Sequence, residues 1–124
     1  MSEVTIKPID EVEPYRGPGE LEGIEFRPVG RALGVTAWGM NVLTLAPGAS
    51  TYPEHDHGDD GQEEVFLVLE GGATLRAGER DWRLERGDMV RVPPGVKRRW
   101  EPGERGATLL AVGATPGKAY EPRR

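Results

Sequence analysis

Glycine and proline interrupt this chain at short intervals, and this spacing restricts its fold more than any other feature of the sequence. The 124 residues include 18 glycines and 11 prolines, most of them placed between short apolar runs. Turns that recur roughly every 8 to 12 residues between runs of β-branched and aromatic side chains are typical of a β-sandwich or barrel. Few segments show a sustained helical period. We therefore predict an all-β domain of about eight or more antiparallel strands.

The strand-like runs lie in the middle of the chain, and both ends lack them. The predicted strands and hairpins cover residues 23–30, 35–48, 63–72, 73–88, 89–95, 96–102 and 107–113. Within the fourth run, a turn at Gly78 and Glu79 predicts a hairpin. We expect an extended N-terminal arm over 1–22, a β-barrel over 23–113 and a C-terminal tail over 114–124.

Composition excludes several classes of protein and site. The chain has no cysteine, which excludes disulfides and thiolate-bound zinc. Its formal net charge of -5 argues against a broad nucleic-acid-binding surface. No apolar run approaches the ~20 residues that span a bilayer, and the N-terminus has no signal-peptide pattern. We expect a soluble, cytoplasmic domain that binds neither nucleic acid nor a membrane.

Both histidines of the chain, His55 and His57, stand one residue apart within residues 52–72. On a strand, residues two apart point to the same face, so both imidazoles would be directed at one point. A carboxylate from a neighbouring strand would complete a set that suits Fe(II) and accommodates Mn, Ni, Cu or Zn. Glu63 and Glu64 point to opposite faces, and alternation alone does not choose between them. Two exposed histidines in an acidic loop are also an ordinary surface feature.

This stretch resembles the first motif of the cupin superfamily, in which a glycine precedes His-x-His and a glutamate and a second glycine follow. Those positions are taken here by Gly48, His55, His57, Glu64 and Gly71. The resemblance implies that Glu64, rather than Glu63, joins the histidines as a metal ligand. The spacings before His55 and after His57 are slightly longer than in the family, and such insertions are tolerated in loops.

The stretch GDMVRVPPGVKRRW, residues 87–100, is similar to the second cupin motif. Arg98 stands where the family has its third histidine, and Pro102 stands where it has asparagine. The two motifs cover 48–102. They imply a small single-domain cupin, a jelly-roll β-barrel with its site inside. Many relatives form homodimers through their sheets and N-terminal arms, and the arm over 1–22 is compatible with a dimer.

Arg98 leaves the state of the site open. Arginine cannot ligate a metal, and it would repel a divalent cation and attract Glu64. In a first arrangement, His55, His57 and Glu64 bind the metal while Arg98 swings aside to grip an anionic substrate. In a second, Arg98 pairs with Glu64, and the pocket binds an acidic molecule without a metal. In a third, Arg98 points outward and the pocket is vestigial.

Four further residues are candidate substrate contacts: Trp100, Trp38, Met40 and Tyr52. Trp100 lies two residues after Arg98 and so faces the same side of its strand. Trp38 and Met40 precede the first motif, on a strand that should border the barrel interior. For the first three, ordinary core packing is the favoured explanation. Tyr52 would bring a hydroxyl near the histidines.

The leading hypothesis is a small cupin that binds a divalent transition metal (Fe, Mn, Ni, Zn or Cu) through His55, His57 and Glu64. It would act on, and in the most frequent chemistry oxidise, a small polar or anionic molecule. If it is an enzyme, it would be a metal-dependent oxidoreductase, dioxygenase or isomerase. The alternative is a metal-free binding or sensing module in which Arg98 anchors an anionic ligand. A purely structural dimer is a third hypothesis.

Overall fold

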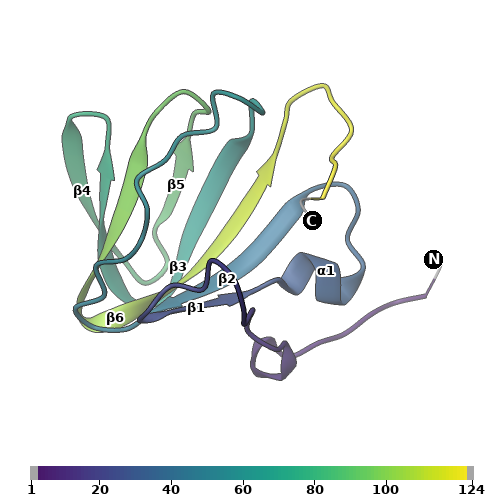
Figure 1. The fold of residues 1–124 in the computed structure, drawn as a ribbon, viewed down its shortest axis with the longest axis horizontal. Helices are drawn as coiled ribbons and strands as arrows, with labels where there is room; N and C mark the ends of the chain where they lie inside the picture. The colour runs from purple at the N-terminus through teal and green to yellow at the C-terminus, as the bar shows by residue number, and fades with distance from the viewer. Residues whose placement is uncertain (1–2, 123–124) are drawn as a thin grey trace.

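The structure, a computed structural model, describes residues 3–122 and consists mainly of β-strands (Figure 1). Within that range the strands are β1 (Ile24–Arg27), β2 (Gly39–Leu45), β3 (Glu63–Ala77), β4 (Arg80–Glu85), β5 (Met89–Val92) and β6 (Arg98–Ala114). A 3-10 turn, η1 (Ile9–Glu11), and a short helix, α1 (Val29–Leu33), complete the described elements. The all-β prediction is confirmed.

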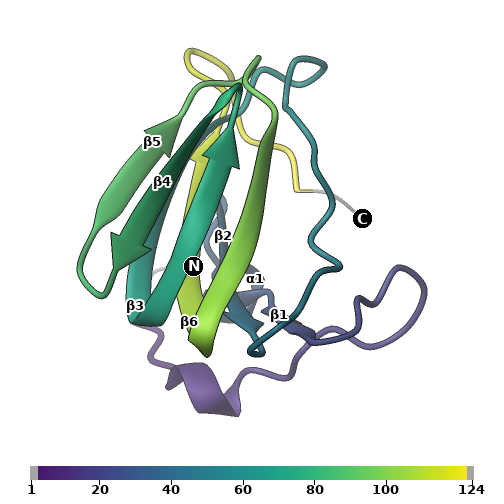
Figure 2. The ribbon, with the colours of Figure 1, turned by 90° about the vertical axis from the view of Figure 1, so that its left-hand side faces the viewer.

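The strands form one antiparallel sheet in the order β1-β2-β6-β3-β4, and β5 pairs with β3. The first part of β3 pairs with β5 through 64–67, and its second part pairs with β4 through 72–77. The strand β6 runs alongside β3 through both parts. Figure 1 shows the resulting curl, with β4 and β5 rising above β1 and β2, and Figure 2 shows β3 and β6 side by side.

The strand count is six, where the turn spacing predicts about eight or more. The predicted run 63–72 and the first part of the run 73–88 are one strand, and most of the run 96–102 joins 107–113 in another. Glycines that normally end a strand here bend it instead. Gly71 has a φ of +68°, and a Cβ placed on it would lie 2.1 Å from the carbonyl oxygen of Gly106. Only glycine permits this close approach of the two backbones, and the register shifts beside it complete the bend.

The main core lies on the concave face of the curled sheet. Alternate residues of each strand face inward, so Phe66 is buried while Val65 is exposed. The largest side chains fully buried there are Trp100, Phe66, Leu45, Leu75, Leu109, Val68 and Val92. The rings of Phe66 and Trp100 meet edge to face, with centroids 5.3 Å apart.

A second, smaller cluster lies on the opposite face of β2. Val42 points to that face and packs with Val29 of α1 and with Val12, which follows η1. The N-terminal segment and α1 therefore cover the outer side of β2, while the inner side of β2 belongs to the main core. This division decides which residues of β2 face the concave side of the sheet.

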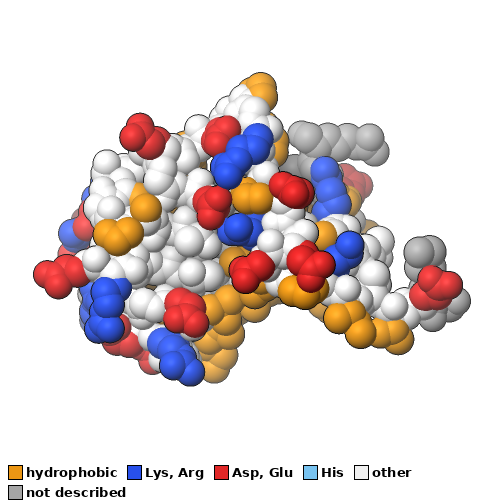
Figure 3. Space-filling model, turned by 90° about the horizontal axis from the view of Figure 1, so that it is seen from below, with side chains coloured by type: hydrophobic (Ala, Val, Ile, Leu, Met, Phe, Trp, Pro, Cys, Tyr) orange, Lys and Arg blue, Asp and Glu red, His pale blue; other side chains and the backbone are white. Residues whose placement is uncertain are grey.

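The predicted hairpin between β3 and β4 is confirmed, with its turn at Gly78 and Glu79. The boundaries predicted at 22 and 113 stay a prediction, and residues 1–2 and 123–124 lie outside the described range. Among the described helices, none is long and apolar enough to cross a membrane. Acidic and basic side chains are interspersed over the face seen from below, and hydrophobic side chains form a band along one edge of that face (Figure 3).

Candidate functional site

Both histidines lie on the long segment between β2 and β3, which crosses the open side of the sheet. The prediction that a regular strand carries them is wrong except at one residue. His55 forms an isolated antiparallel bridge to Arg98, with its N–H donating to Arg98 O at 3.2 Å and its carbonyl accepting at 2.9 Å. His57 N–H also donates to Pro94 O at 2.8 Å, but no further bridge forms here among the described residues, since Pro53 lacks a backbone donor and Gly58 N–H donates to the Asp56 carboxylate in a turn.

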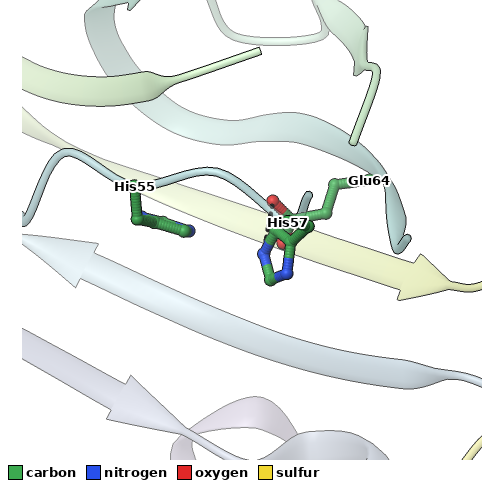
Figure 4. A group of neighbouring side chains, drawn as sticks. All are labelled: His55, His57 and Glu64. Carbon is green, nitrogen blue, oxygen red and sulfur yellow. Dashed lines mark ion pairs between the residues drawn. The ribbon is translucent and has the colours of Figure 1, made fainter. Parts of the chain in front are cut away.

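The two imidazoles nevertheless converge, and Glu64 of β3 joins them. The ligand atoms of His55, His57 and Glu64 all lie within 4.8 Å of one another. The two rings stand nearly perpendicular, with centroids 5.2 Å apart, and His57 Nε2 is 3.4 Å from Glu64 Oε1. Figure 4 shows the three side chains gathered together. Glu63 instead pairs with Arg91 on the exposed face, so the structure groups Glu64 with the histidines.

Each histidine has its Nδ1 beside a fixed acceptor. His55 Nδ1 lies 3.0 Å from the carbonyl oxygen of Pro53, and His57 Nδ1 lies 3.1 Å from Asp60 Oδ1. Since a carbonyl and a carboxylate can only accept, each contact is made with Nδ1 as the donor, and a neutral imidazole in that tautomer offers its Nε2 lone pair to a metal. Metal-binding histidines almost always donate their second ring N–H in this way.

Asp60 is a site residue that the sequence interpretation missed. Besides meeting His57, its Oδ1 accepts from Gln62 N–H at 3.0 Å, and its carbonyl accepts from the Thr115 hydroxyl at 2.7 Å. These contacts fix its carboxylate against the ring. The signal was present in the sequence, because an aspartate three residues after the second histidine, in a glycine-flanked turn, is placed to reach back to it.

Arg98 points inward, and its side chain is 0 % exposed. Nη1 donates to Glu64 Oε1 at 2.6 Å, Nη2 to the Pro93 carbonyl at 2.7 Å and Nε to the Val96 carbonyl at 3.0 Å. The side chain has therefore neither swung aside nor turned outward. Of the three arrangements considered for Arg98, the structure contains the ion pair with Glu64.

Two imidazoles and a carboxylate form a donor set that suits a divalent metal. Arg98 contacts one of these ligands, Glu64, and is compatible with metal binding. His57 Nε2 lies 3.4 Å from Glu64 Oε1, and either a proton on Nε2 or a metal cation beside both atoms would satisfy this contact. Arg98 meets only Oε1 of Glu64 and so does not occupy Oε2. A ligating carboxylate that accepts a hydrogen bond from an outer residue is the usual arrangement in metal sites.

Tyr52 lies beside this group and is buried. Its ring centroid is 5.8 Å from that of His55. Burial raises the pKa of the Tyr52 hydroxyl far above its ordinary value, Glu64 raises it further and Arg98 opposes the change. The hydroxyl therefore keeps its proton at neutral pH and stands near the histidines as a hydrogen-bond donor.

The other three predicted substrate contacts lie elsewhere. Trp100 is 1 % exposed and packs in the core against Phe66. Met40 packs against the cluster on the outer side of β2, and Trp38, 43 % exposed, precedes that strand. Even-numbered residues of β2 face outward, so the expectation that Trp38 and Met40 border the barrel interior is wrong.

Comparison with known proteins agrees with this geometry. Residues 41–113 match the family model of the cupin domain. A sugar phosphate isomerase of the cupin superfamily from Silicibacter pomeroyi is similar, with 26% identity and a TM-score of 0.69 over 88% of this chain and 75% of that one. No curated protein matches the chain.

Two further solved structures are similar at lower identity, where the likeness shows the fold alone. A predicted oxalate decarboxylase from Thermotoga maritima has 22% identity and a TM-score of 0.72 over 89% of this chain and 98% of that one. A cupin protein from Bacteroides fragilis has 18% identity and a TM-score of 0.65 over 91% and 92%. The matched region is more than half of the chain and contains the histidines, Glu64 and Arg98, so this chain belongs to the cupin domain family.

Proposed function

We propose that this cupin binds a divalent transition metal through His55, His57 and Glu64 and acts on a small anionic molecule. The observation that carries the proposal is the convergence of His55, His57 and Glu64, each of which offers a ligand atom within 4.8 Å of the others. Pro53 O and the Asp60 carboxylate lie beside the Nδ1 atoms of the two histidines and hold the rings in place. Two histidines on an ordinary surface would not require an acceptor beside each Nδ1 atom.

The charge of the site supports an anionic substrate. Arg98 offsets Glu64 at 2.6 Å, and Asp60 beside His57 offsets one charge of a bound divalent ion, so one positive charge would remain uncompensated. A third histidine in place of Arg98 would leave none. The names of two similar structures also refer to small anions, a sugar phosphate and oxalate. A positively charged interior site raises the local concentration of such molecules.

A bound Fe, Mn, Ni, Zn or Cu ion would supply Lewis acidity and open coordination positions. The residues of the chain would orient the metal ligands and offer a protonated hydroxyl. His55 and His57 hold their orientation through Pro53 and Asp60, and Glu64 is held by Arg98. Tyr52 offers a protonated hydroxyl beside the group. Oxidation, isomerisation and decarboxylation of a small anion are the reactions that we propose for such a site.

Metal binding is tested by purifying the protein without chelators and reconstituting it with each of the five metals. Mass spectrometry of the desalted protein should find close to one equivalent of at least one metal. Glu64→Gln should lose that metal, while Glu63→Gln, which alters the adjacent exposed pair with Arg91, should keep it. Less than about a tenth of an equivalent of every metal in the wild type would refute the proposal.

The second candidate is a site that binds its ligand without a metal. The Arg98–Glu64 ion pair favours this candidate, because Arg98 already supplies a cation to the Glu64 carboxylate. In one form of this candidate, Arg98 itself anchors the ligand. The burial of Arg98 argues against that form, since all three of its side-chain nitrogens donate within the protein. If wild type takes up no metal while Arg98→His does, the metal-free candidate replaces the first. The homodimer and the cytoplasmic location expected from the sequence remain proposals.

A further inference from the structure

A separate hollow of about 540 Å³ opens between β4 and β5, and none of the three candidate metal ligands lines it. It exists because these consecutive strands pair with different parts of β3 and diverge from each other. Its walls are mainly apolar and include Leu75, Ala77, Trp82, Leu84, Val90 and Val92. A volume of roughly 300 to 1,000 Å³ with apolar walls is usual for small-molecule sites.

Trp82 is the residue that most distinguishes this hollow from an ordinary gap in the core. It has the same strand parity as Leu84, which is buried, and both line the hollow. Its indole is nevertheless 40 % exposed. A large flat apolar surface thus borders a cavity without being covered by the chain, which is the arrangement of an aromatic wall in a binding site.

The rim of the hollow is more basic than acidic. Arg80, Arg83 and Arg91 contribute to its lining, against Glu79 and Asp88. Arg83 and Arg91 pair with carboxylates, and Asp88 accepts from the backbone N–H of Glu85. Arg80 lies 5.0 Å from the centroid of the Trp82 ring and forms no ion pair within residues 3–122. A guanidinium beside an aromatic face is placed to meet the charged end of a ligand that stacks there.

We infer that this hollow is a second ligand site, which takes a small anion with a flat aromatic body, such as an aromatic carboxylate. The ring lies against Trp82 between β4 and β5, and the carboxylate meets Arg80 at the rim. The inference is independent of metal binding, because none of the candidate metal ligands lines the hollow. The two sites adjoin through Pro93 and Val96, which line the hollow and accept hydrogen bonds from Arg98.

The test is a titration of metal-depleted, ¹⁵N-labelled full-length protein with 2-naphthoate, followed by NMR. We expect saturable shifts of the Trp82 indole N–H and of amides in β4 and β5. Trp82→Ala should weaken binding about tenfold, whereas Trp38→Ala, which removes an equally exposed indole outside the hollow, should not. Arg80→Gln should weaken binding and abolish the preference for 2-naphthoate over the neutral 2-naphthalenemethanol, while Arg105→Gln on the exposed bend of β6 should do neither.

Three results would overturn the inference. The first is the absence of saturable shifts in the wild type. The second is equal affinity in the Trp82→Ala and Trp38→Ala proteins. The third is a hollow already covered by a second copy of the chain, in which case Trp82→Ala would lower the molar mass measured by light scattering and the wild type would not bind 2-naphthoate. Metal uptake by the same wild-type sample is measured separately, so failure here leaves the metal proposal unaffected.

Discussion

Arg98 alters the candidate site through both its charge and its hydrogen bonds. A histidine in its place would be a neutral ligand, whereas the guanidinium is a cation and can only donate. Its three nitrogens donate to Glu64, Pro93 and Val96, so it ties the carboxylate of β3 to the loop that precedes β6. We therefore regard Arg98 as a positioning residue for Glu64 and no longer as a contact for substrate.

Replacing Arg98 by leucine should destabilise the protein strongly, by about 3 to 5 kcal/mol, because a buried pair would lose one partner. The exposed pair between Arg91 and Glu63 provides the matched control. Arg91→Leu should cost less than about 1 kcal/mol, since solvent screens that pair. Urea unfolding of both variants measures the difference. Similar losses in the two proteins would show that the Arg98 contact contributes no more than a surface pair.

At this scale the sequence predicted the convergence of His55, His57 and Glu64, because these three occupy motif positions. It offered the pair with Glu64 as one of three arrangements for Arg98 and did not predict all of its partners. Two of these are backbone carbonyls, which every residue carries and which leave no signature in the sequence.

The long strands β3 and β6 position the site, and their bends could not be read from the sequence. Glycine within a strand-like run indicates either its end or a bulge, and only the pairing partner decides which applies. At Gly71 the partner is Gly106, whose carbonyl lies where a Cβ would stand. Therefore β3 joins two runs that were predicted as separate strands, and so does β6. The β3–β4 hairpin was predicted correctly because its turn depends on local residues alone.

Gly71→Ala should be far more destabilising than Gly78→Ala. Both glycines have positive φ, at +68° and +61°, so both substitutions incur the strain of the left-handed conformation, about 1 to 2 kcal/mol. A Cβ at Gly78 meets nothing within 4 Å, whereas one at Gly71 would collide with the backbone at 2.1 Å. The difference in thermal unfolding between the two variants isolates the collision. Equal losses would mean that the two strands do not cross so closely.

The molecule as a whole should lose stability at high pH through Tyr52. Burial raises the pKa of this hydroxyl above its unfolded value of 10.0, so the folded state holds the proton more tightly. The resulting stabilisation is complete below pH 10.0 and is lost as the pH rises through the folded-state pKa. Chemical unfolding between pH 9 and 11.5 should show a decline that is shallower in Tyr52→Phe. Tyr15→Phe, at an exposed tyrosine, should decline as steeply as the wild type. A Tyr52→Phe slope equal to that of the wild type would contradict the assignment.

The continuity of β3 and β6 has a consequence for how the protein opens. Each strand passes through both parts of the curled sheet, so β4, β5 and β2 all depend on the same two central strands. Neither part can open without disturbing the backbone pairing of the other. Local opening is thereby confined to the segments outside this pair, and the strand amides of β3 and β6 exchange with solvent only when the entire domain unfolds. The bent strands thus make the domain one cooperative unit.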